Sequence, residues 1–554
     1  MIALIDLDKN KAILMYLCEV DICGFKGIKQ LTLSLNKDAN VLIGENQWGR
    51  SSLISALMLI SLDNFYYQFT ANDFFNDDHY QPNTATIRYK FAEMNPQELD
   101  SQSYHSLNCV AYQSVEFKKL ITYQIKATKE QDKIVTEHQF LDNNGKEIKN
   151  VDHYSLIKQL ISLNPCMRLK NPVDSSNLPV TNQPLSDYYI QQLSAKLSEH
   201  AKQFSNEDLI KSLTTAKALF EYYLADSSTR FRYRNSNIKT IPNSQDWDSL
   251  ERLNNILDEL DDNYIRTMLM GIFGSIFIAH NANQIHPNAI PILVMEEPES
   301  QLHPIILSVG FRLLKNFPAQ KFITTNSSDL LSLFALKNIY HLIRKPSGIM
   351  AMNIGEKGLS RDDNRKIMFH ILYRRASAMF ARCWLLVEGE TEVWLLRELA
   401  ELSGFHLNAE GIQLIEFAQC GLKPLIRYAN KMGIHWYVLT DGDTAGKKYA
   451  NTVRSLCPEG TSADQFLTVL PSRDIENFMF EHGFSLVYKK IAFNTTDYID
   501  IPVNRIVHKA IKKTSKPDLA IAICDDVRIR GSQTIPKLLK QTFSKVIQLT
   551  KQFY

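Results

Sequence analysis

Apolar residues along this chain fall into short runs separated by amphipathic stretches, a pattern typical of an α/β protein. The runs that predict buried strands lie at 16–22, 41–43, 290–295, 384–387, 413–417 and 437–440. Helical periodicity follows several of them, over 52–60 and in stretches that end at Leu402 and Met432. Because strands that alternate with helices form parallel sheets, we expect parallel α/β sheets in both terminal portions of the chain.

The middle of the chain, roughly 150–265, is polar and mostly helical in its pattern, and this predicts a helical insert. Within 186–225, leucine and tyrosine residues recur at near-helical intervals. The apolar run 268–279 is too short to cross the roughly 30 Å hydrocarbon core of a membrane and predicts a buried helix. Met15 stands directly before the first strand, and we expect it to be an alternative start.

Composition narrows the class of protein. With 554 residues, 45% of them hydrophobic and 22% charged, the chain is an ordinary globular one that needs more than one hydrophobic core. None of its eight cysteines forms a CxxC pair, so neither a zinc site nor a disulfide framework is expected. This cysteine usage and the absence of a signal-peptide pattern favour the cytoplasm, with no membrane partner.

Positive charge is concentrated at the C-terminal end of a chain whose net charge is only +2. Residues 505–554 contain eleven Lys and Arg against three Asp and Glu. Arg505, Lys509, Lys512 and Lys516 recur at helical spacing, opposite apolar positions. Such a face binds phosphates by counterion release, or is simply a solvated helix surface.

A glycine-bounded loop, GENQWGRSS at 44–52, lies between the strand 41–43 and the following helix. This is the setting of a phosphate loop, in which backbone N–H groups and the helix N-terminus surround phosphate oxygens. Ser51 is placed to ligate Mg²⁺, and Arg50 stands where lysine is usual. Arginine keeps the charge but is a planar fork, so we expect nucleotide binding with slow hydrolysis. The alternative is an ordinary turn before a helix.

Two adjacent carboxylates follow the strand 290–295. In phosphoryl transfer, one acid holds the magnesium ion and its neighbour orients the attacking water. We assign the first role to Glu296 and the second, catalytic role to Glu297. Together with the phosphate loop, this pair predicts an ATPase whose fold is interrupted by a large insert.

Four further carboxylates stand at the ends of two predicted strands. Glu388 and Glu392 belong to EGETE at 388–392, and Asp441 and Asp443 to DGD at 441–443. Because the carboxyl ends of neighbouring parallel strands meet at one edge of a sheet, these acids should converge and repel one another. Mg²⁺ or Mn²⁺ ions would neutralise them, and a two-ion site is suited to phosphodiester displacement. The alternative is a set of surface acids at turns.

Several motifs of the first half resemble the ATPase half of the OLD (overcoming lysogenization defect) family. They are GFKGI at 24–28, the loop at 44–52, EEPESQLHP at 296–304 and TTNS at 324–327. The resemblance implies an ABC/RecF-type ATPase that binds ATP with one Mg²⁺, and an insert that helps dimerisation. The cofactor-binding residues it implies are Gly44, Asn46, Gly49, Arg50, Ser51, Ser52, Glu296 and Asn326.

This chain departs from the family pattern in its ATPase half. Family members typically carry a histidine in the motif at 324–327, where Asn326 stands here. An amide donates a hydrogen bond but carries no charge. No clear LSGG-like signature segment, as ABC-type ATPases carry, is found between 225 and 290. These departures and Arg50 together favour nucleotide binding as a slow conformational or dimerising switch.

The acids of the second half resemble a Toprim domain, as found in topoisomerases, primases and OLD-family nucleases. SRDIEN at 472–477 resembles the third acidic element of the family, which makes Glu476 a ligand of the second metal ion. Asp474 is the alternative ligand, or else a helix cap. Lys516 matches a family lysine that stabilises charge on the cleaved phosphate, and Lys513 competes for this catalytic role.

The sequence therefore predicts an α/β protein with an ABC/RecF-type ATPase domain over 1–375, a helical insert at about 150–265, and a Toprim nuclease domain over 376–554. We expect a metal-dependent DNA endonuclease or nickase gated by ATP, acting on DNA as a homodimer or higher homo-oligomer. The alternative is a non-nucleolytic ATPase module of DNA repair or phage defence that binds DNA or a partner. Strand passage, primer synthesis and transport fit less well, because no tyrosine domain or zinc module is evident and a transporter would not use the second acidic cluster.

Overall fold

The structure of the protein is a computed structural model. It describes residues 15–45, 48–62, 64–77, 80–94, 104–113, 118–131, 133–169, 190–195, 197–198, 205–224, 251, 253–255, 289–301, 308, 311–312, 314, 319–457, 460–494 and 501–551. Asn46, the residues before Met15, the apolar run 268–279 and the LHP part of the acidic motif lie outside these ranges.

The chain forms two compact units. The first comprises residues 1–334 with 338–351, and the second comprises residues 335–337 with 352–554. The contacts therefore divide the chain before the expected boundary at 375/376, because residues 352–375 pack with the second unit. The predicted extents of the two functional domains stay predictions.

The first unit contains an antiparallel sheet in the order β2-β1-β4-β6-β5, with β7 paired to β6. Its strands are β1 (Met15–Phe25), β2 (Ile28–Ser34), β4 (Thr84–Glu93), β5 (Ala111–Gln113), β6 (Lys119–Glu130) and β7 (Lys133–Leu141). Buried and exposed positions alternate along β2 and β4, as expected for a sheet with one covered face. The expected strand at 16–22 is confirmed within β1, but the parallel pairing expected for this portion is wrong here.

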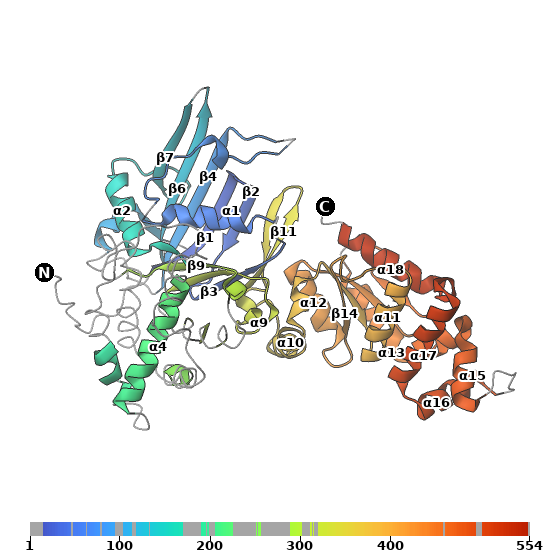
Figure 1. The fold of residues 1–554 in the computed structure, drawn as a ribbon. Coiled ribbons are helices and arrows are strands. Elements are labelled where there is room, and N and C mark those ends of the chain that lie inside the picture. Colours follow the sequence, from blue (N-terminus) through green and yellow to red (C-terminus); the bar gives the residue numbers. More distant parts are fainter. Residues whose placement is uncertain are drawn as a thin grey trace. The chain divides into compact units, whose positions relative to one another are not determined.

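A second sheet of the first unit has the order β12-β11-β3-β10-β9-β8, and Figure 1 labels its strands β11, β3 and β9. Its strands are β3 (Ala39–Ile43), β8 (Cys166–Leu169), β9 (Ile292–Glu296), β10 (Gln320–Thr324), β11 (Ile339–Lys345) and β12 (Gly348–Met352). All pairings from β11 through β8 are parallel. In this register Thr324 lies beside both Leu42 and Glu296, so the carboxyl ends of β3, β10 and β9 are adjacent.

Helix α1 (Arg50–Leu57) follows β3 and joins the two sheets of the first unit in one core. Leu53 and Leu57 of α1 are fully buried in a cluster that also contains Val20 of β1 and Val294 of β9. The other helices described in this unit are α2 (His153–Leu163), α4 (Asn206–Leu224) and α9 (Ser328–Leu331). Helix α4 lies in the segment for which the sequence predicts helices.

The second unit is built on a parallel sheet in the order β14-β13-β15-β16. Its strands are β13 (Cys383–Val387), β14 (Ile412–Glu416), β15 (His435–Thr440) and β16 (Leu467–Val469). Successive residues of β13 face opposite sides. Leu385 packs in the cluster with α11 and α17, whereas the Trp384 ring stacks on Tyr428 of α12, 5.9 Å between centroids. Helices thus cover both faces, and the predicted α/β class is confirmed.

The predicted helices that end at Leu402 and Met432 are confirmed as α11 and α12 among the helices of the second unit. The helices described in this unit are α10 (Arg361–Ile367), α11 (Glu390–Leu402), α12 (Leu422–Met432), α13 (Thr444–Leu456), α14 (Ile475–Met479), α15 (Ser485–Phe493), α16 (Val503–Lys513), α17 (Lys516–Arg530) and α18 (Lys537–Thr550). The basic helix exists as α16, with Ile506 and Ala510 buried. Placing Lys516 on its face is wrong, because Ser515 starts a new helix by accepting a hydrogen bond from the Asp518 N–H.

Membrane-spanning helices and disulfides are both expected to be absent. Within the ranges that the structure describes, no helix combines the length and the apolar character needed to cross a membrane. All eight cysteines lie in those ranges, and all are free thiols.

A buried glutamine connects the two sheets of the first unit and provides a test of this architecture. Gln320 of β10 accepts a hydrogen bond from the Leu17 N–H at 3.0 Å and donates to Leu17 O at 2.8 Å and Asn36 O at 2.9 Å. Gln320→Leu would remove the hydrogen bonds to the buried N–H and carbonyl of Leu17, so we expect the unfolding free energy of the unit to fall by about 2–4 kcal/mol. Urea denaturation, followed by hydrogen–deuterium exchange in the peptide that covers β1, measures the effect. Gln68→Leu, at an exposed position, is the control and should change little; equal stability of the two variants would contradict the role of Gln320.

Candidate functional site

Two glycines shape the loop between β3 and α1. Gly49 is the N-cap of α1 and has a left-handed backbone with φ of 83°. A Cβ atom at Gly49 would lie 2.4 Å from Cδ1 of Ile349, and one at Gly44 would lie 2.9 Å from Leu342 O. Both positions therefore require glycine, and the backbone can follow the turn expected of a phosphate loop. Asn46, the third predicted loop residue, lies outside the described residues.

Ser51 and Ser52 stand in the first turn of α1. The Ser51 side chain is exposed, as a ligand of a bound ion would have to be. Ser52 Oγ accepts a hydrogen bond from the Gly27 N–H at 3.1 Å, which ties the turn at 24–28 to the helix. Trp48 is buried, and its ring lies 6.0 Å from that of His341, so it packs in this structure.

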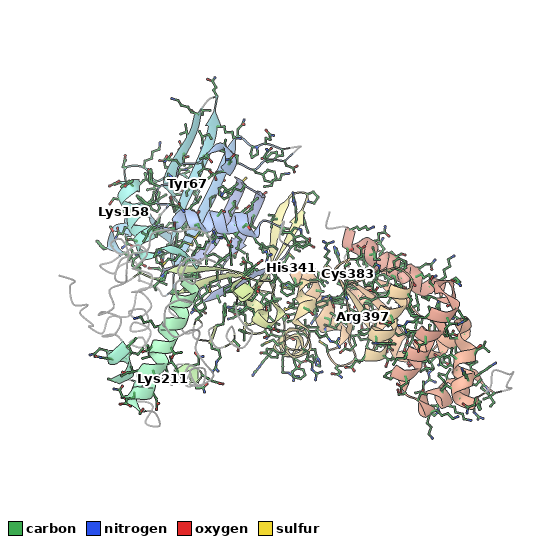
Figure 2. The ribbon with its side chains drawn as sticks, in the orientation of Figure 1. Tyr67, Lys158, Lys211, His341, Cys383 and Arg397 are labelled. Carbon is green, nitrogen blue, oxygen red and sulfur yellow. The ribbon has the colours of Figure 1, made fainter. Side chains whose placement is uncertain are left out.

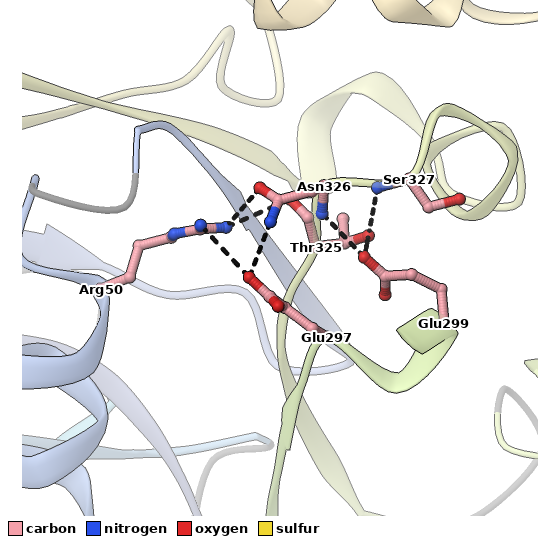
Figure 3. Close-up of polar contacts among 6 residues, drawn as sticks. All are labelled: Arg50, Glu297, Glu299, Thr325, Asn326 and Ser327. Carbon is pink, nitrogen blue, oxygen red and sulfur yellow. Dashed lines mark hydrogen bonds and ion pairs between the residues drawn. The ribbon is translucent and has the colours of Figure 1, made fainter. Parts of the chain in front are cut away.

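Arg50 is buried and lies in a network with the predicted residues Glu297 and Asn326 (Figure 3). Its Nη1 donates to Asn326 Oδ1 at 2.9 Å and to Thr325 O at 3.4 Å. Its Nη2 lies 3.4 Å from Glu297 Oε1, and Asn326 Nδ2 donates to the same oxygen at 2.7 Å. Burial lowers the pKa of Arg50, and the nearby glutamates raise it in part. The guanidinium is thus engaged by protein groups.

Glu299 is a member of this network that sequence reasoning missed. Its Oε1 accepts hydrogen bonds from Thr325 Oγ1 at 2.7 Å and from the Asn326 N–H at 2.8 Å (Figure 3). Among the described residues, its Oε2 is buried without a hydrogen-bond partner. Its position three residues after Glu296, in the same acidic motif, is the signal in the sequence that could have identified Glu299 as a site residue. A carboxylate oxygen buried in this way fits a site that admits a further donor or a cation.

Glu296, the predicted magnesium ligand, forms an ion pair with Arg168 of β8. The parallel pairing of β8 with β9 places this arginine beside the acidic motif. Glu297, directly after β9, has a left-handed backbone with φ of 40°, and its N–H donates to Thr324 O at 2.9 Å. Each of the two adjacent acids is therefore balanced by an arginine of the chain itself.

In the second unit, Glu388 and Asp441 meet at the carboxyl edge of the parallel sheet. Glu388 follows β13 and Asp441 follows β15, which pair directly. Glu388 Oε1 accepts a hydrogen bond from the Asp441 N–H at 3.1 Å. The convergence inferred from strand ends is thus present for this pair.

Glu392 and Asp443 stand at two helix starts beside this pair. Glu392 lies in the first turn of α11, where its Oε2 would be 2.8 Å from a Cβ atom placed on Gly389. Asp443 caps α13, and its Oδ1 accepts from the Gly446 N–H at 2.7 Å. Ligation by Asp443 would therefore use its other oxygen or replace the cap.

Glu476 and Lys516 form the remaining part of the predicted cluster. Glu476 of α14 is buried, and its Oε1 lies 2.7 Å from Nζ of Lys516. Asp474 caps α14 by accepting from the Asn477 N–H at 2.8 Å, so the helix-cap interpretation of Asp474 describes what it does here. Asn477 Oδ1 is a buried oxygen with no hydrogen-bond partner in the described part of the chain.

These carboxylates shift one another's ionisation. Burial, then Glu388, Glu392, Asp474 and Glu476, raise the pKa of Asp441 to about 8. Burial also raises the pKa values of Glu388 and Glu392. The charge of Asp443 raises the pKa of Glu388 further, and the charge of Glu476 raises that of Glu392. Clustered oxygen donors that resist ionisation fit a hard divalent cation. As the side chains stand, however, no three His, Cys, Asp or Glu residues of the described ranges are arranged to hold an ion.

The raised pKa of Asp441 predicts a pH-dependent stability. A carboxyl group with a higher pKa in the folded state than in the unfolded chain binds its proton more tightly when folded, so stability falls as pH rises from about 4 to about 8. In EDTA, Asp441→Asn should unfold at higher urea than the wild type at pH 8, and the difference should shrink at pH 5. Urea titrations at both pH values measure this, with Asp464→Asn, an exposed acid, as control. A difference that does not change with pH would contradict the assignment.

Two family models match consecutive parts of the chain and meet at 378/379, beyond the limit of the two compact units at 351/352. Residues 15–378 match the family described as Protein of unknown function (DUF2813), and residues 379–443 match the TOPRIM domain of overcoming lysogenization defect protein-like sequences. A curated relative from Escherichia coli (strain K12), Uncharacterized protein YbjD, is 38% identical over 550 residues, covering 97% of this chain and 99% of the relative.

Two solved structures are similar to parts of the chain. The C-terminal region of the Burkholderia pseudomallei OLD protein is 18% identical, with a TM-score of 0.27, over 31% of this chain and 99% of that one. The SMC head domain from Thermotoga maritima is 10% identical, with a TM-score of 0.28, over 61% of this chain and 98% of that one. On the two family matches, which follow one another along the sequence, the chain belongs to the OLD family, with a DUF2813 region followed by an OLD-like TOPRIM domain.

Proposed function

We propose that this protein is an ATP-binding DNA endonuclease or nickase that depends on divalent metal ions, with nucleotide binding in the first unit gating cleavage in the second. The observation that carries the proposal is the gathering of Glu388, Glu392, Asp441 and Glu476 at one sheet edge, where the pKa of Asp441 is raised to about 8. Such a cluster is stabilised when cations are bound.

Each residue of the cluster has a proposed role in cleavage of a phosphodiester. Glu388, Glu392, Asp441, Asp443 and Glu476 would hold Mg²⁺ or Mn²⁺, which neutralise charge on the phosphate. Hydrolysis forms a bond from a water oxygen to phosphorus and breaks the bond to the leaving oxygen. Lys516 contacts the cluster through Glu476, and its Nζ would donate to a phosphate oxygen as negative charge builds up.

A plasmid assay tests the nuclease directly. With Mg²⁺ or Mn²⁺ the wild type should convert supercoiled DNA to nicked or linear forms, and Asp441→Ala should lower the rate by more than roughly a hundredfold, because loss of a ligand exceeds the 10–100-fold effect of outer-shell changes. Asp464→Ala, in the same unit but away from the cluster, should cut like the wild type. No cutting by the wild type with either ion would reject the nuclease and favour the non-nucleolytic alternative.

The contacts of Arg50 support a slow nucleotide switch. A phosphate that binds in the loop at 44–52 competes for the guanidinium with Asn326 and with the Glu297 carboxylate. Glu296 is likewise engaged by Arg168, so binding of Mg²⁺ with the nucleotide competes with that ion pair. Nucleotide binding therefore rearranges two ion pairs, a conformational change that the gating proposal requires.

This competition predicts that removal of the Glu297 charge tightens nucleotide binding. Glu297→Gln should lower the Kd for a fluorescent ATP analogue by about tenfold, the size of one hydrogen bond to a charged group. Its ATP hydrolysis should fall below that of the wild type, because Glu297 is the proposed group that orients water. Glu19→Gln, which removes an ion pair with Lys90 elsewhere in the same unit, is the matched control. Unchanged affinity in Glu297→Gln would contradict the competition.

A further inference from the structure

A second feature of the C-terminal unit lies outside the carboxylate cluster, in residues 361–375, which we name the basic–aromatic segment. It consists of α10 (Arg361–Ile367), a single π-helical turn (Met368–Leu372) and the residues that follow. Two large aromatic side chains, Phe369 and Tyr373, are 51% and 58% exposed. The two rings stand one helical turn apart; exposed apolar side chains that form a contiguous patch often mark a binding surface, and π-helical turns are frequent at functional sites.

The basic–aromatic segment is positively charged. Its cations outnumber its acids by five to two: they are Arg361, Arg365, Lys366, Arg374 and Arg375. Asp362 pairs with Arg365 at 2.9 Å and with Lys366 at 2.8 Å, so part of the charge is balanced locally. Burial and then the positive charges of Arg374, Arg375, Arg365 and Lys366 lower the pKa of His370.

Aromatic and basic groups of the segment are in direct contact. The Arg374 guanidinium lies 4.9 Å from the centre of the Phe369 ring, and the Phe369 and His370 rings meet edge to face at 5.1 Å. A flat aromatic face next to a guanidinium offers stacking for a base and a donor for the adjoining phosphate. An apolar surface of a partner protein, in contrast, would not be attracted by these positive charges.

The basic–aromatic segment lies at the sheet edge that carries the acids. Arg375 forms an ion pair with Glu416, the last residue of β14, which is the neighbour of β13. Arg374 Nη1 donates to Gln419 Oε1 at 3.4 Å. One residue before Gln419, the Ala418 N–H donates to Glu388 O at 3.1 Å. A single short loop thus separates the arginines from a predicted metal ligand.

Helix α11 extends this surface. Burial lowers the pKa of Arg375, and two charged residues of α11 also affect it: Glu390 raises this pKa, whereas Arg397, labelled in Figure 2, lowers it. Trp394, 38% exposed, lies between these two positions at helical spacing and therefore on the same face of α11.

We propose that the basic–aromatic segment binds a DNA strand with unpaired bases, which stack on Phe369 and Tyr373 while the arginines contact the backbone phosphates. The bases of a duplex are already stacked on each other. A single strand or a frayed junction has unstacked bases, which can stack on these aromatic side chains. The inference rests on the proposed function, which makes DNA the substrate. It adds that the DNA near the carboxylate cluster is single-stranded.

Binding can be measured without cleavage, by fluorescence anisotropy of a labelled single-stranded oligodeoxynucleotide with the full chain in EDTA. Phe369→Ala and Tyr373→Ala should each weaken binding about tenfold, and binding to a duplex of the same sequence should change far less. Arg374→Gln should reduce the slope of log affinity against log salt by roughly one phosphate contact. Tyr373→Phe, which keeps the ring, and Ile529→Ala, at an 84% exposed apolar position of the same unit, are the controls and should bind like the wild type.

The outcomes separate this inference from the proposed function. Wild-type affinity in both alanine variants, or no binding of the single strand by the wild type, would overturn the inference even if plasmid is cut. The molar mass of the variants in solution can be measured by light scattering. If the alanine variants change this mass but bind DNA like the wild type, the segment is a protein interface and the inference is overturned. Loss of single-strand binding in the alanine variants supports the inference, even where the wild type cuts nothing and the nuclease proposal fails.

Discussion

The direct pairing of β13 with β15 is the constraint on which the C-terminal unit depends. It brings Glu388 and Asp441 together at one sheet edge, and the starts of α11 and α13 add Glu392 and Asp443. Like charges at such spacing destabilise the fold unless something offsets them. Within the chain, a backbone N–H supports Glu388, and protonation of Asp441 relieves part of the repulsion. Lys516 offsets the charge of Glu476.

The N-terminal unit meets the same electrostatic problem in another way. There the acids at the end of β9 are balanced by arginines, Arg168 for Glu296 and Arg50 for Glu297. Permanent cations of the protein take up the charge that an ion and a nucleotide would otherwise share, because a guanidinium does not lose its proton near neutral pH. The two acidic clusters therefore differ in kind. The cluster of the C-terminal unit has too few positive charges to neutralise its acids, whereas the acids of the N-terminal unit are already nearly neutralised by arginines.

Much of both sites was predictable because it depends on local signals. A buried apolar run followed by an acid marks a strand end, and this signal identifies Glu296, Glu388 and Asp441 from the sequence alone. Partners that come from distant strands were not predictable in this way. Arg168 reaches Glu296 through the pairing of β8 with β9, which the sequence between them does not reveal.

Secondary structure shows the same division between local and distant information. The antiparallel sheet is not predicted although β4 alternates clearly, because the alternation of strands with helices favours parallel sheets for the whole terminal portion. The assignment of Lys516 to the basic helix failed at a helix boundary that spacing alone does not show. At Ser515 the backbone leaves the helical region, with φ of 151°, so the lysine begins α17 and faces Glu476.

The position of β3 in its sheet has a consequence for how this protein is made. Leu42 of β3 pairs with Thr324 of β10, and His341 of β11 pairs with Ile43, so the partners of β3 are synthesised about 280 residues after it. At about 5–20 residues per second, the nascent strand waits on the order of 15–60 s for them. During that time the apolar residues of β3 lack their sheet partners, and exposed apolar surface of this kind is prone to aggregation.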